Sequence, residues 1–310
     1  MREMQLILFT SSINFWSVLG KHLNYVDVFS LLEVAMNIIE ALLVLVIGFI
    51  VGVPSSMIGL GGGFIIVPVL ILFFQLPAQN AIAVSLVAIC GTTLSSTLGY
   101  IRQRRVDYKL GLLYDILDVP GIALGAYITT LLPQNFLAGI CGTFIIVISL
   151  LVIKYKESPC SEEKPEANKA NMEWTRNRID SWGKAFKYTL RSPHLALTSS
   201  FLGGLITGLS GLGGGITDVS TMILLGIPTH IAVASSEFAM AVTNGAGVVA
   251  HGLLNNILVE YALPITIGTV IGAQVGCSLA KRVKGKAVRR ILSLIAVFAG
   301  LRLIYSFFTS

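Results

Sequence analysis

Two identical glycine clusters are the feature of this sequence most suited to binding a ligand. The motif Gly-Leu-Gly-Gly-Gly occurs at Gly59–Gly63 and again at Gly211–Gly215, each time within apolar sequence. Glycine inside a helix costs about 1 kcal/mol relative to alanine, so four glycines in five positions need a physical reason. Each motif precedes a short apolar segment, and the free N–H groups and positive dipole end of a helix start attract anions.

We therefore predict one anion site built from both motifs. Its backbone ligands are Gly59, Gly61, Gly62, Gly63, Gly211, Gly213, Gly214 and Gly215. The alternative is close packing, because small residues let membrane helices approach each other.

Hydroxyl and amide side chains lie on the segments that follow the short ones: Ser85, Thr93, Ser235, Ser236 and Asn244. Ser236 and Asn244 are eight residues apart and share one helix face. These side chains would donate hydrogen bonds to substrate oxygens. Hydrogen bonding between helices is the competing role.

Two acidic residues, Asp218 and Glu237, fall within the apolar second half of the chain, where ionisable groups are costly and usually functional. Their counterparts in the first half are Ile66 and Leu86, so neither acid has a symmetric partner. We predict a role in proton coupling or gating, because a protonated carboxyl group would not repel a neighbouring anion. The alternatives are helix capping for Asp218 and a structural hydrogen bond for Glu237.

The composition indicates a polytopic α-helical membrane protein. Of the 310 residues, 54% are hydrophobic and only 12% are charged, whereas a soluble domain carries about 25% charged residues. The net charge of +6 comes from basic residues in short loops, which indicates membrane orientation rather than nucleic-acid binding. The four cysteines form no Cys-x-x-Cys pair, and we expect no disulfide, no metal and no cofactor.

Hydropathy predicts ten segments, at about 34–58, 61–76, 79–101, 109–131, 135–154, 193–210, 213–227, 229–251, 257–280 and 288–308. The apolar parts of the second and seventh segments, Phe64–Leu76 and Ile216–Ile227, have 13 and 12 residues. At 1.5 Å per residue each covers about 20 Å, which is less than the roughly 30 Å of the hydrocarbon core.

The segments form a tandem repeat of five each. After the shared motif, Pro77 corresponds to Pro228, and Ser85 corresponds to Ser236. We predict repeat 1 at 34–155, a cytoplasmic linker at 156–192, repeat 2 at 193–310, and an interfacial or partial-span segment at 1–33. The linker is expected to be a disordered or short helical connector.

Loop charges predict that the two repeats are inverted. Basic loops follow the third segment of repeat 1 and the fourth segment of repeat 2, while the loops between segments 4 and 5 and between segments 8 and 9 carry no Lys or Arg. The basic loops are therefore cytoplasmic, by the positive-inside rule. Arg102 and Arg105 would lie at the cytoplasmic mouth, where they set topology and attract anions.

The paired motifs, the following proline and the Ala-x-Ala-x-Ser run resemble the sulfite exporter TauE/SafE family, also called the 4-toluene sulfonate uptake permease family, over about residues 35–308. The resemblance implies transport of sulfite, thiosulfate or sulfonates across a bacterial cytoplasmic (inner) membrane. One departure is that Pro68 follows the first motif where Ser220 follows the second, so the two helix starts need not be equivalent.

Together these features predict a secondary transporter that exports small sulfur oxyanions by alternating access. The membrane potential supplies about 2.3 kcal/mol per charge per 100 mV, and proton coupling is a variant. The alternatives are an anion channel, an uptake permease for sulfonates, and an intramembrane enzyme, although the sequence has no catalytic motif such as HExxH or GxSxG and no P-loop. The expected partners are a small sulfur-containing anion and the lipid bilayer, without nucleic acid, and a homo-oligomer is left open.

Overall fold

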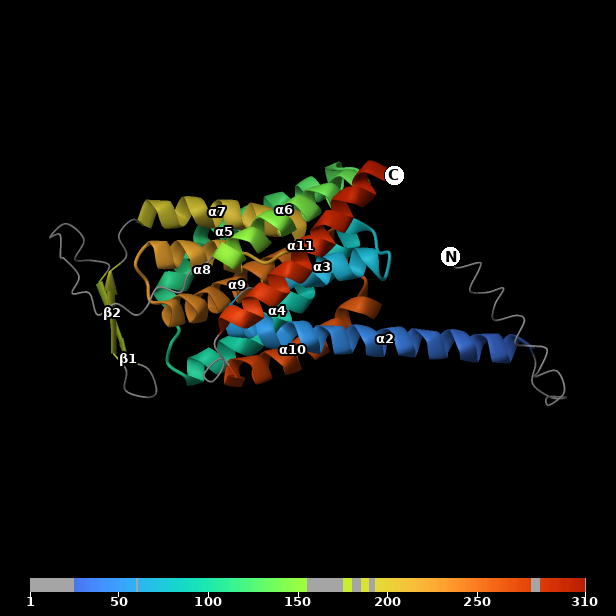
Figure 1. Cartoon of the computed structure of the whole chain (residues 1–310), viewed down its shortest axis with the longest axis horizontal. Coiled ribbons are helices and arrows are strands. Elements are labelled where there is room, and N and C mark those ends of the chain that lie inside the picture. The colour runs from blue at the N-terminus through green and yellow to red at the C-terminus, as the bar shows by residue number, and fades with distance from the viewer. Residues whose placement is uncertain are drawn as a thin grey trace. The chain divides into compact units, whose positions relative to one another are not determined.

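The structure is a computed structural model that describes residues 25–59, 61–154, 175–179, 185–189, 193–279 and 285–309. In these residues the chain is helical apart from one two-stranded hairpin (Figure 1). The elements in chain order are α2 (Tyr25–Ile58), α3 (Gly63–Leu72), α4 (Ala78–Arg102), α5 (Tyr108–Leu131), α6 (Gln134–Lys154), β1 (Thr175–Ile179), β2 (Ala185–Thr189), α7 (Pro193–Ser210), α8 (Gly215–Leu224), α9 (Thr229–Leu253), α10 (Val259–Leu279) and α11 (Gly285–Thr309).

The chain divides into two compact units, residues 1–43 and 44–310. Helix α2 begins in the first unit, and its residues from Val44 onward belong to the second. Most of the predicted N-terminal segment at 1–33 lies outside the described residues. All the residues discussed below lie in the second unit.

Helix boundaries agree with the predicted segments to within a few residues from α3 onward, because local signals define them. Helices α4 and α9 begin directly after Pro77 and Pro228, where the missing proline N–H costs nothing. Helix α5 begins after Asp107, whose carboxylate accepts from the backbone N–H of Lys109 at 3.1 Å.

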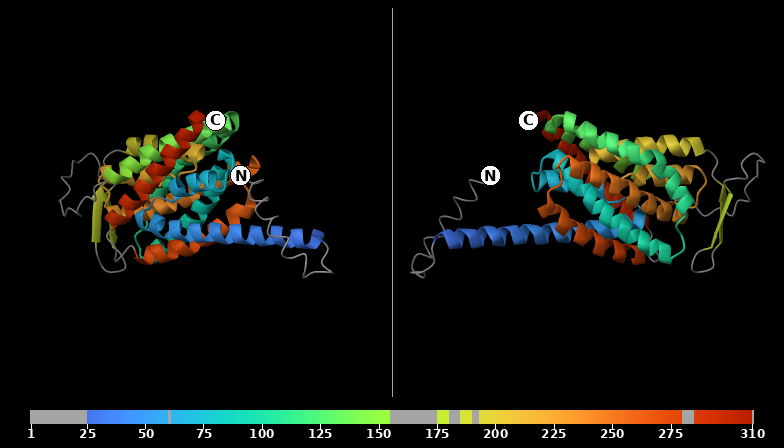
Figure 2. Two further views of the ribbon diagram at one scale, coloured as in Figure 1. Left: turned by 45° about the vertical axis from the view of Figure 1, so that its right-hand side comes forward. Right: turned by 180° about the vertical axis from the view of Figure 1, so that it is seen from behind.

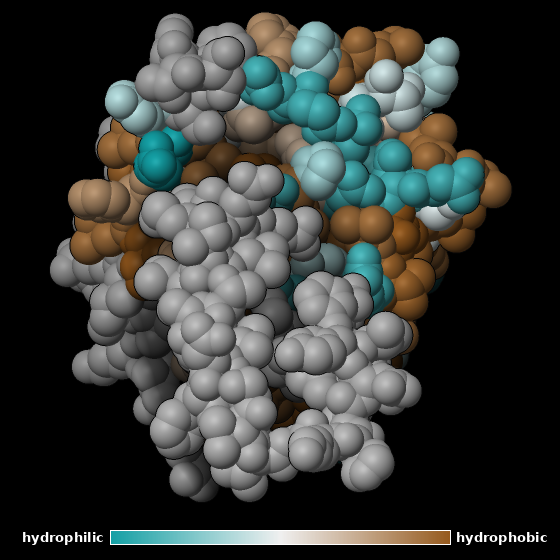
Figure 3. Space-filling view, turned by 90° about the vertical axis from the view of Figure 1, so that its right-hand side faces the viewer, coloured by the Kyte–Doolittle hydropathy of each residue, from teal (hydrophilic) through white to brown (hydrophobic). Residues whose placement is uncertain are grey.

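The surface and the helix lengths fit a membrane protein. Four helices in the described part of the chain are long and apolar enough to cross a bilayer, at Ile38–Ile58, Ala78–Arg102, Tyr108–Leu131 and Val259–Leu279. Large hydrophobic side chains point outward from several helices, such as Leu98 at 58% exposure and Phe298 at 82%. Figure 3 shows hydrophilic residues gathered in a band on one end face, with hydrophobic residues beside it. The coarse prediction of a helical, multi-pass protein is confirmed, with the hairpin as the exception.

Helices of the two halves pack against each other through glycines. Gly268 and Gly272 of α10 lie against backbone oxygens of α2, and Gly121 and Gly125 of α5 lie against backbone oxygens of α7. A β-carbon on any of these glycines would come within 3.0 Å of an oxygen on the neighbouring helix. The first helix of each half therefore packs on the fourth helix of the other half, as small residues allow.

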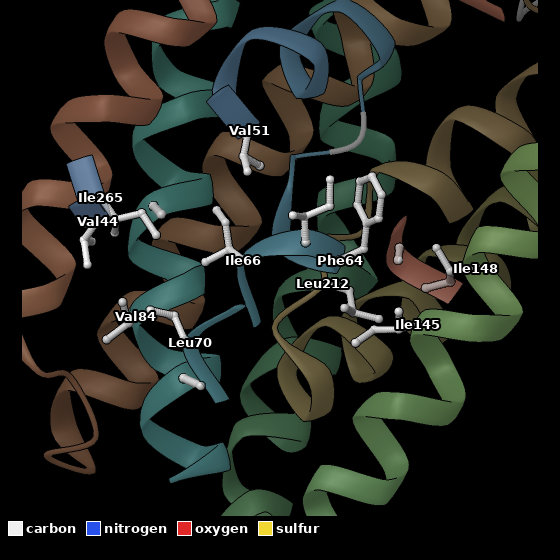
Figure 4. Packing of buried hydrophobic residues seen from close by; sticks show 14 of the residues in the cluster. Val44, Val51, Phe64, Ile66, Leu70, Val84, Ile145, Ile148, Leu212 and Ile265 are labelled. Atoms are coloured by element: carbon white, nitrogen blue, oxygen red, sulfur yellow. The ribbon is translucent and has the colours of Figure 1, made fainter. Parts of the chain in front are cut away.

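The short helix α3 lies inside the largest cluster of buried hydrophobic residues. Figure 4 shows Phe64 and Ile66 of α3 among side chains from α2, α4, α6, α10 and the second glycine motif. Both side chains are almost fully buried, at 1% and 0% exposure. A helix that is too short to span a bilayer is thus shielded from lipid by its neighbours, as buried broken helices require.

The expectation that the linker is disordered or helical is wrong for the part that the structure describes. Strands β1 and β2 form an antiparallel hairpin in which Thr175 pairs with Thr189. Figures 1 and 2 show this hairpin at one end of the helices, whereas the C-terminus lies at the other. Tyr188 of β2 is buried, and its hydroxyl donates to Asp107 Oδ2 at 2.6 Å. This tertiary contact holds the hairpin against the start of α5.

Candidate functional site

The glycine motifs break the chain directly ahead of the two short helices, as predicted. Gly59, Gly61 and Gly62 have φ values of 79°, 72° and 91°, and Gly211 and Gly213 have values of 65° and 79°. Side chains rarely tolerate this left-handed region, so glycine is required for the backbone turn itself. Helices α3 and α8 then begin at the last glycine of each motif.

The two broken loops cross and touch each other. A β-carbon on Gly63 would lie within 3.0 Å of the Gly211 oxygen, and a β-carbon on Gly215 would lie within 3.0 Å of the Gly59 oxygen. The hydroxyl of Ser85, on α4, donates to the same Gly211 oxygen at 2.7 Å. Close packing, the alternative given above, therefore accounts for these glycines in this conformation. Ligand binding by the N–H groups remains a prediction.

The predicted hydroxyl and amide side chains differ in whether they bond another element, bond their own helix or have an atom without a partner. Ser235 joins two helices by accepting from the backbone N–H of Asp107 at 2.9 Å, as Ser85 does by donating. Thr93 and Asn244 donate to carbonyl oxygens of their own helices. Ser236 Oγ and Asn244 Oδ1 are buried, and no hydrogen-bond partner for them lies among the described residues. These two atoms lie on one face of α9, and substrate binding by their side chains remains a prediction.

Asp218 is not a helix cap. Its side chain is fully buried, and neither carboxylate oxygen has a hydrogen-bond partner in the described part of the chain. Helix α8 is preceded by Gly214 and has no side-chain cap. A buried and unpaired carboxyl group is costly, which is typical of a group kept for function.

Glu237 links the two halves. Its Oε2 accepts a hydrogen bond from the Ser96 hydroxyl on α4, as the structural alternative predicted. Its Oε1 is buried, and no hydrogen-bond partner for it lies within the described ranges. One carboxyl group therefore has one satisfied oxygen and one oxygen available for a proton.

Two further acids on α5, Asp115 and Asp118, were not among the predicted site residues. Both are buried, and the Thr243 Oγ1 on α9 lies 2.8 Å from a carboxyl oxygen of each. The signal was available, because two acids three residues apart in an apolar segment share one helix face and are costly in a bilayer. Only the contact with Thr243 was beyond sequence reasoning.

No basic side chain on the surrounding helices balances these acids. Helices α7, α8 and α9 contain no Lys or Arg, and α5 contains only Lys109, which is exposed at its start. Among the described residues, no three His, Cys, Asp or Glu side chains are arranged to hold a metal ion. The buried carboxyl groups of α5 and α8 are therefore not explained by ion pairs with these helices or by a chelated metal.

The predicted mouth arginines lie where α4 meets α5. Arg102, at the end of α4, is exposed, and Arg105 in the following loop is partly buried. In Figure 1 this connection is at the same end as the hairpin. Cys90, Cys141 and Cys277 are not in disulfide bonds.

A comparison with protein families adds evidence that spans both glycine motifs. The model of the family described as "Sulfite exporter TauE/SafE" matches residues 44–303. The chain belongs to the sulfite exporter TauE/SafE family. The match covers almost the whole second unit, including α3, α8 and the buried acids.

Two of the curated proteins similar to this chain match over nearly their whole length. "Probable membrane transporter protein YunE" of Bacillus subtilis is 35% identical over 85% of this chain and 97% of the relative. "Probable membrane transporter protein MJ0441" of Methanocaldococcus jannaschii is 23% identical over 84% of this chain and 93% of the relative. "Sulfite exporter TauE/SafE family protein 3" of Arabidopsis thaliana is 32% identical, but only over 34% of this chain and 22% of the relative. No solved structure matches the chain.

Proposed function

We propose that this TauE/SafE protein is a secondary transporter that exports small sulfur oxyanions, such as sulfite, thiosulfate or an organosulfonate, across the bacterial inner membrane. The observation that carries the proposal is the pair of broken loops that cross next to the starts of α3 and α8. The N–H groups of Gly59 and Gly211 donate to Ser55 O and Thr207 O at the ends of the preceding helices. The later glycines of each motif, at the two helix starts, would supply the N–H groups for an anion without a buried arginine.

Substrate oxygens contact the glycine N–H groups and the side chains of α9. Ser236 Oγ can donate a hydrogen bond, and the Asn244 amide can turn its N–H₂ toward the substrate. Ser236 supports the assignment because its Oγ has no partner in the described part of the chain. The Asn244 N–H₂ donates to the Met240 carbonyl oxygen at 2.7 Å and would have to leave it to reach a substrate oxygen.

Alternating access follows from the interlocked halves. The reciprocal pairs α2 with α10 and α5 with α7 make two bodies, each built from both halves of the chain. In inverted-repeat transporters such bodies rock around a central site. Separation of the crossing loops, at Gly63 with Gly211 and Gly215 with Gly59, would open that site.

The membrane potential drives the anion outward, and buried acids couple or gate the movement. Arg102 and Arg105 attract anions at the cytoplasmic mouth. Asp218 lies at the start of α8, where protonation would remove repulsion of an anion. Glu237 holds α9 to α4 through Ser96, so release of this bond accompanies opening.

The test is efflux of labelled sulfite from proteoliposomes, with membrane potential and pH gradient imposed separately. We expect saturable efflux that an inside-negative potential accelerates. Asn244→Ala should raise the half-saturating sulfite concentration, whereas Asn135→Ala, at an exposed asparagine near the start of α6, should not. Efflux that rises linearly with concentration would favour a channel, and no flux of sulfite, thiosulfate or sulfonate would refute the proposal.

A further inference from the structure

Thr243 makes two hydrogen bonds that a single hydroxyl proton cannot supply. Its Oγ1 lies 2.8 Å from Asp115 Oδ1 and 2.8 Å from Asp118 Oδ2. A hydroxyl group has one proton, and an ionised carboxylate only accepts hydrogen bonds. If Thr243 donates to one carboxylate, the other contact is a hydrogen bond only when that carboxyl group is protonated and donates to the Thr243 oxygen.

The geometry points to a proton-binding site made by Asp115, Thr243 and Asp118, with Asp218 as a third carboxyl group that exchanges the proton. We call these four residues the acid cluster. The inference rests on the proposed transport function for its role, but the bound proton itself rests only on the contacts.

Asp218 is aimed at the same space. An atom at the β-carbon position of Gly214 would lie 3.5 Å from Asp218 Oδ2 and 3.6 Å from Asp118 Oδ2, with Thr207 Oγ1 at 3.4 Å. Asp218 is fully buried, and both its oxygens are without a hydrogen-bond partner in the described chain. Carboxyl groups from α5 and α8 thus both lie against Gly214 of the second glycine motif.

Three ionised carboxylates cannot remain together in this environment. Like charges in a poorly solvated site oppose ionisation, and no Lys or Arg on α7, α8 or α9 compensates them. The other buried titratable side chains described on α5, α7, α8 and α9 are Tyr114, Glu237 and His251. Tyr114 lies near Asp218, Glu237 bonds Ser96 and His251 contacts Asn256, so none supplies a cation to the cluster. Bound protons would neutralise the carboxylates without a cationic side chain.

The cluster combines residues of both repeats, but the symmetry-related position lacks the three acids. The counterparts of Asp115, Asp118 and Asp218 are Ala262, Ile265 and Ile66. The counterpart of Thr243 is Thr92, which donates to the carbonyl oxygen of Ala88 in its own helix. A pseudo-symmetric pair of glycine motifs therefore has a single proton site.

This position predicts the direction of coupling. The cluster borders Gly214, one of the predicted anion ligands, so ionised Asp118 and Asp218 would repel the substrate. A proton in the cluster removes that repulsion, and proton and anion should therefore bind together and cross in the same direction. For a monoanion this movement is electroneutral and follows the pH gradient alone. A dianion that moves with one proton still carries one negative charge, so an inside-negative potential still drives it outward.

The proton can be tested without transport. Infrared spectra of the purified protein at neutral pH should contain a protonated carboxyl stretch that shifts in heavy water. Asp118→Asn should remove that band, because the amide now donates to Thr243 while Asp115 stays ionised. Thr243→Val should shift the band and Thr243→Ser should preserve it. Glu260→Gln, at an exposed acid on α10, is the matched control and should change nothing.

Coupling is then measured with methanesulfonate, which stays a monoanion at every pH used, at zero membrane potential. Efflux from liposomes with an acidic lumen should exceed efflux under the reversed gradient, by up to about tenfold for one pH unit. In Asp118→Asn the two rates should become equal, while exchange of labelled for unlabelled methanesulfonate persists. Size-exclusion profiles exclude misfolding, and Asp115→Asn provides a second variant.

Each other outcome has a defined meaning. If the protonated carboxyl band is absent, or if neither Asp118→Asn nor Asp115→Asn changes it, the proposed proton site is refuted. If efflux still depends on the pH gradient in Asp118→Asn but not in Glu237→Gln, the coupling proton is bound by Glu237 and not by the acid cluster. If efflux depends on a sodium gradient and not on pH, the coupling ion is sodium. A band that behaves as predicted in a protein that transports neither sulfite nor a sulfonate leaves the proton site standing and refutes the proposed function.

Discussion

Substitution of Gly63 by alanine tests the contact between the two broken loops. The new β-carbon would lie 2.7 Å from Ile89 Cδ1 and 2.8 Å from the carbonyl carbon of Leu212, and closer still to the Gly211 oxygen. Ile89 can rotate, but the two backbone atoms cannot. The loops must therefore move apart.

The expected cost follows from two opposing terms. Overpacking in a dense core costs about 1–3 kcal/mol, and the rigid backbone contact places Gly63→Ala at the upper end of that range. Alanine regains about 1 kcal/mol of helix propensity at the start of α3. The net loss is about 2 kcal/mol, which for a chain of 310 residues corresponds to a decrease of about 3 °C in melting temperature.

The assay is thermal unfolding of detergent-purified protein at one fixed scan rate, since such unfolding is often irreversible. Gly245→Ala is the matched control, because nothing lies within 4 Å of the β-carbon position of Gly245 inside α9. This variant should gain about 0.5–1 kcal/mol. The double variant Gly63→Ala with Gly215→Ala should lose less than the sum of its single losses, because one separation of the loops relieves both clashes.

If Gly63→Ala, like the control Gly245→Ala, melts at or above the wild-type temperature, the two loops are not in the tight contact described above. Strict additivity of the Gly63 and Gly215 variants would show that the two contacts do not share one crossing.

Three further predictions concern the surroundings of the site. Ser85→Ala leaves the buried Gly211 carbonyl without its donor and should cost about 1–3 kcal/mol of stability in the same melting assay. Tyr188→Phe removes the donor to Asp107 Oδ2, so the hairpin should detach, which limited proteolysis would detect as faster cleavage between the two halves. Arg102→Glu should slow sulfite efflux from the cytoplasmic side at low ionic strength and leave it unchanged at 1 M salt, where the Debye length is about 3 Å.

Local chemistry explains which elements could be predicted. The left-handed glycines and the prolines ahead of α4 and α9 act through their own backbone, so the short helices and most boundaries could be read from spacing alone. The linker could not be read in this way. Its hairpin is held by the contact of Tyr188 with Asp107, 81 residues earlier in the chain, and no local pattern encodes such a contact.

In the candidate site too, features set by local spacing could be predicted, whereas features set by tertiary contacts could not. Ser236 and Asn244 were placed on one face of a helix by their spacing, and both carry an atom left without a partner in the described structure. The capping role offered for Asp218 failed, because capping is a local geometry that the observed side chain does not adopt.

The sequence by itself determined a multi-pass helical membrane protein with two glycine-broken short helices, because composition and backbone preference act locally. Only the tertiary structure decided that the two motifs touch, and that Thr243 meets Asp115 and Asp118 across 128 and 125 residues of chain. The physical reason is that packing between helices chooses which buried polar groups face each other. In a bilayer that choice decides whether a carboxyl group is costly or holds a proton.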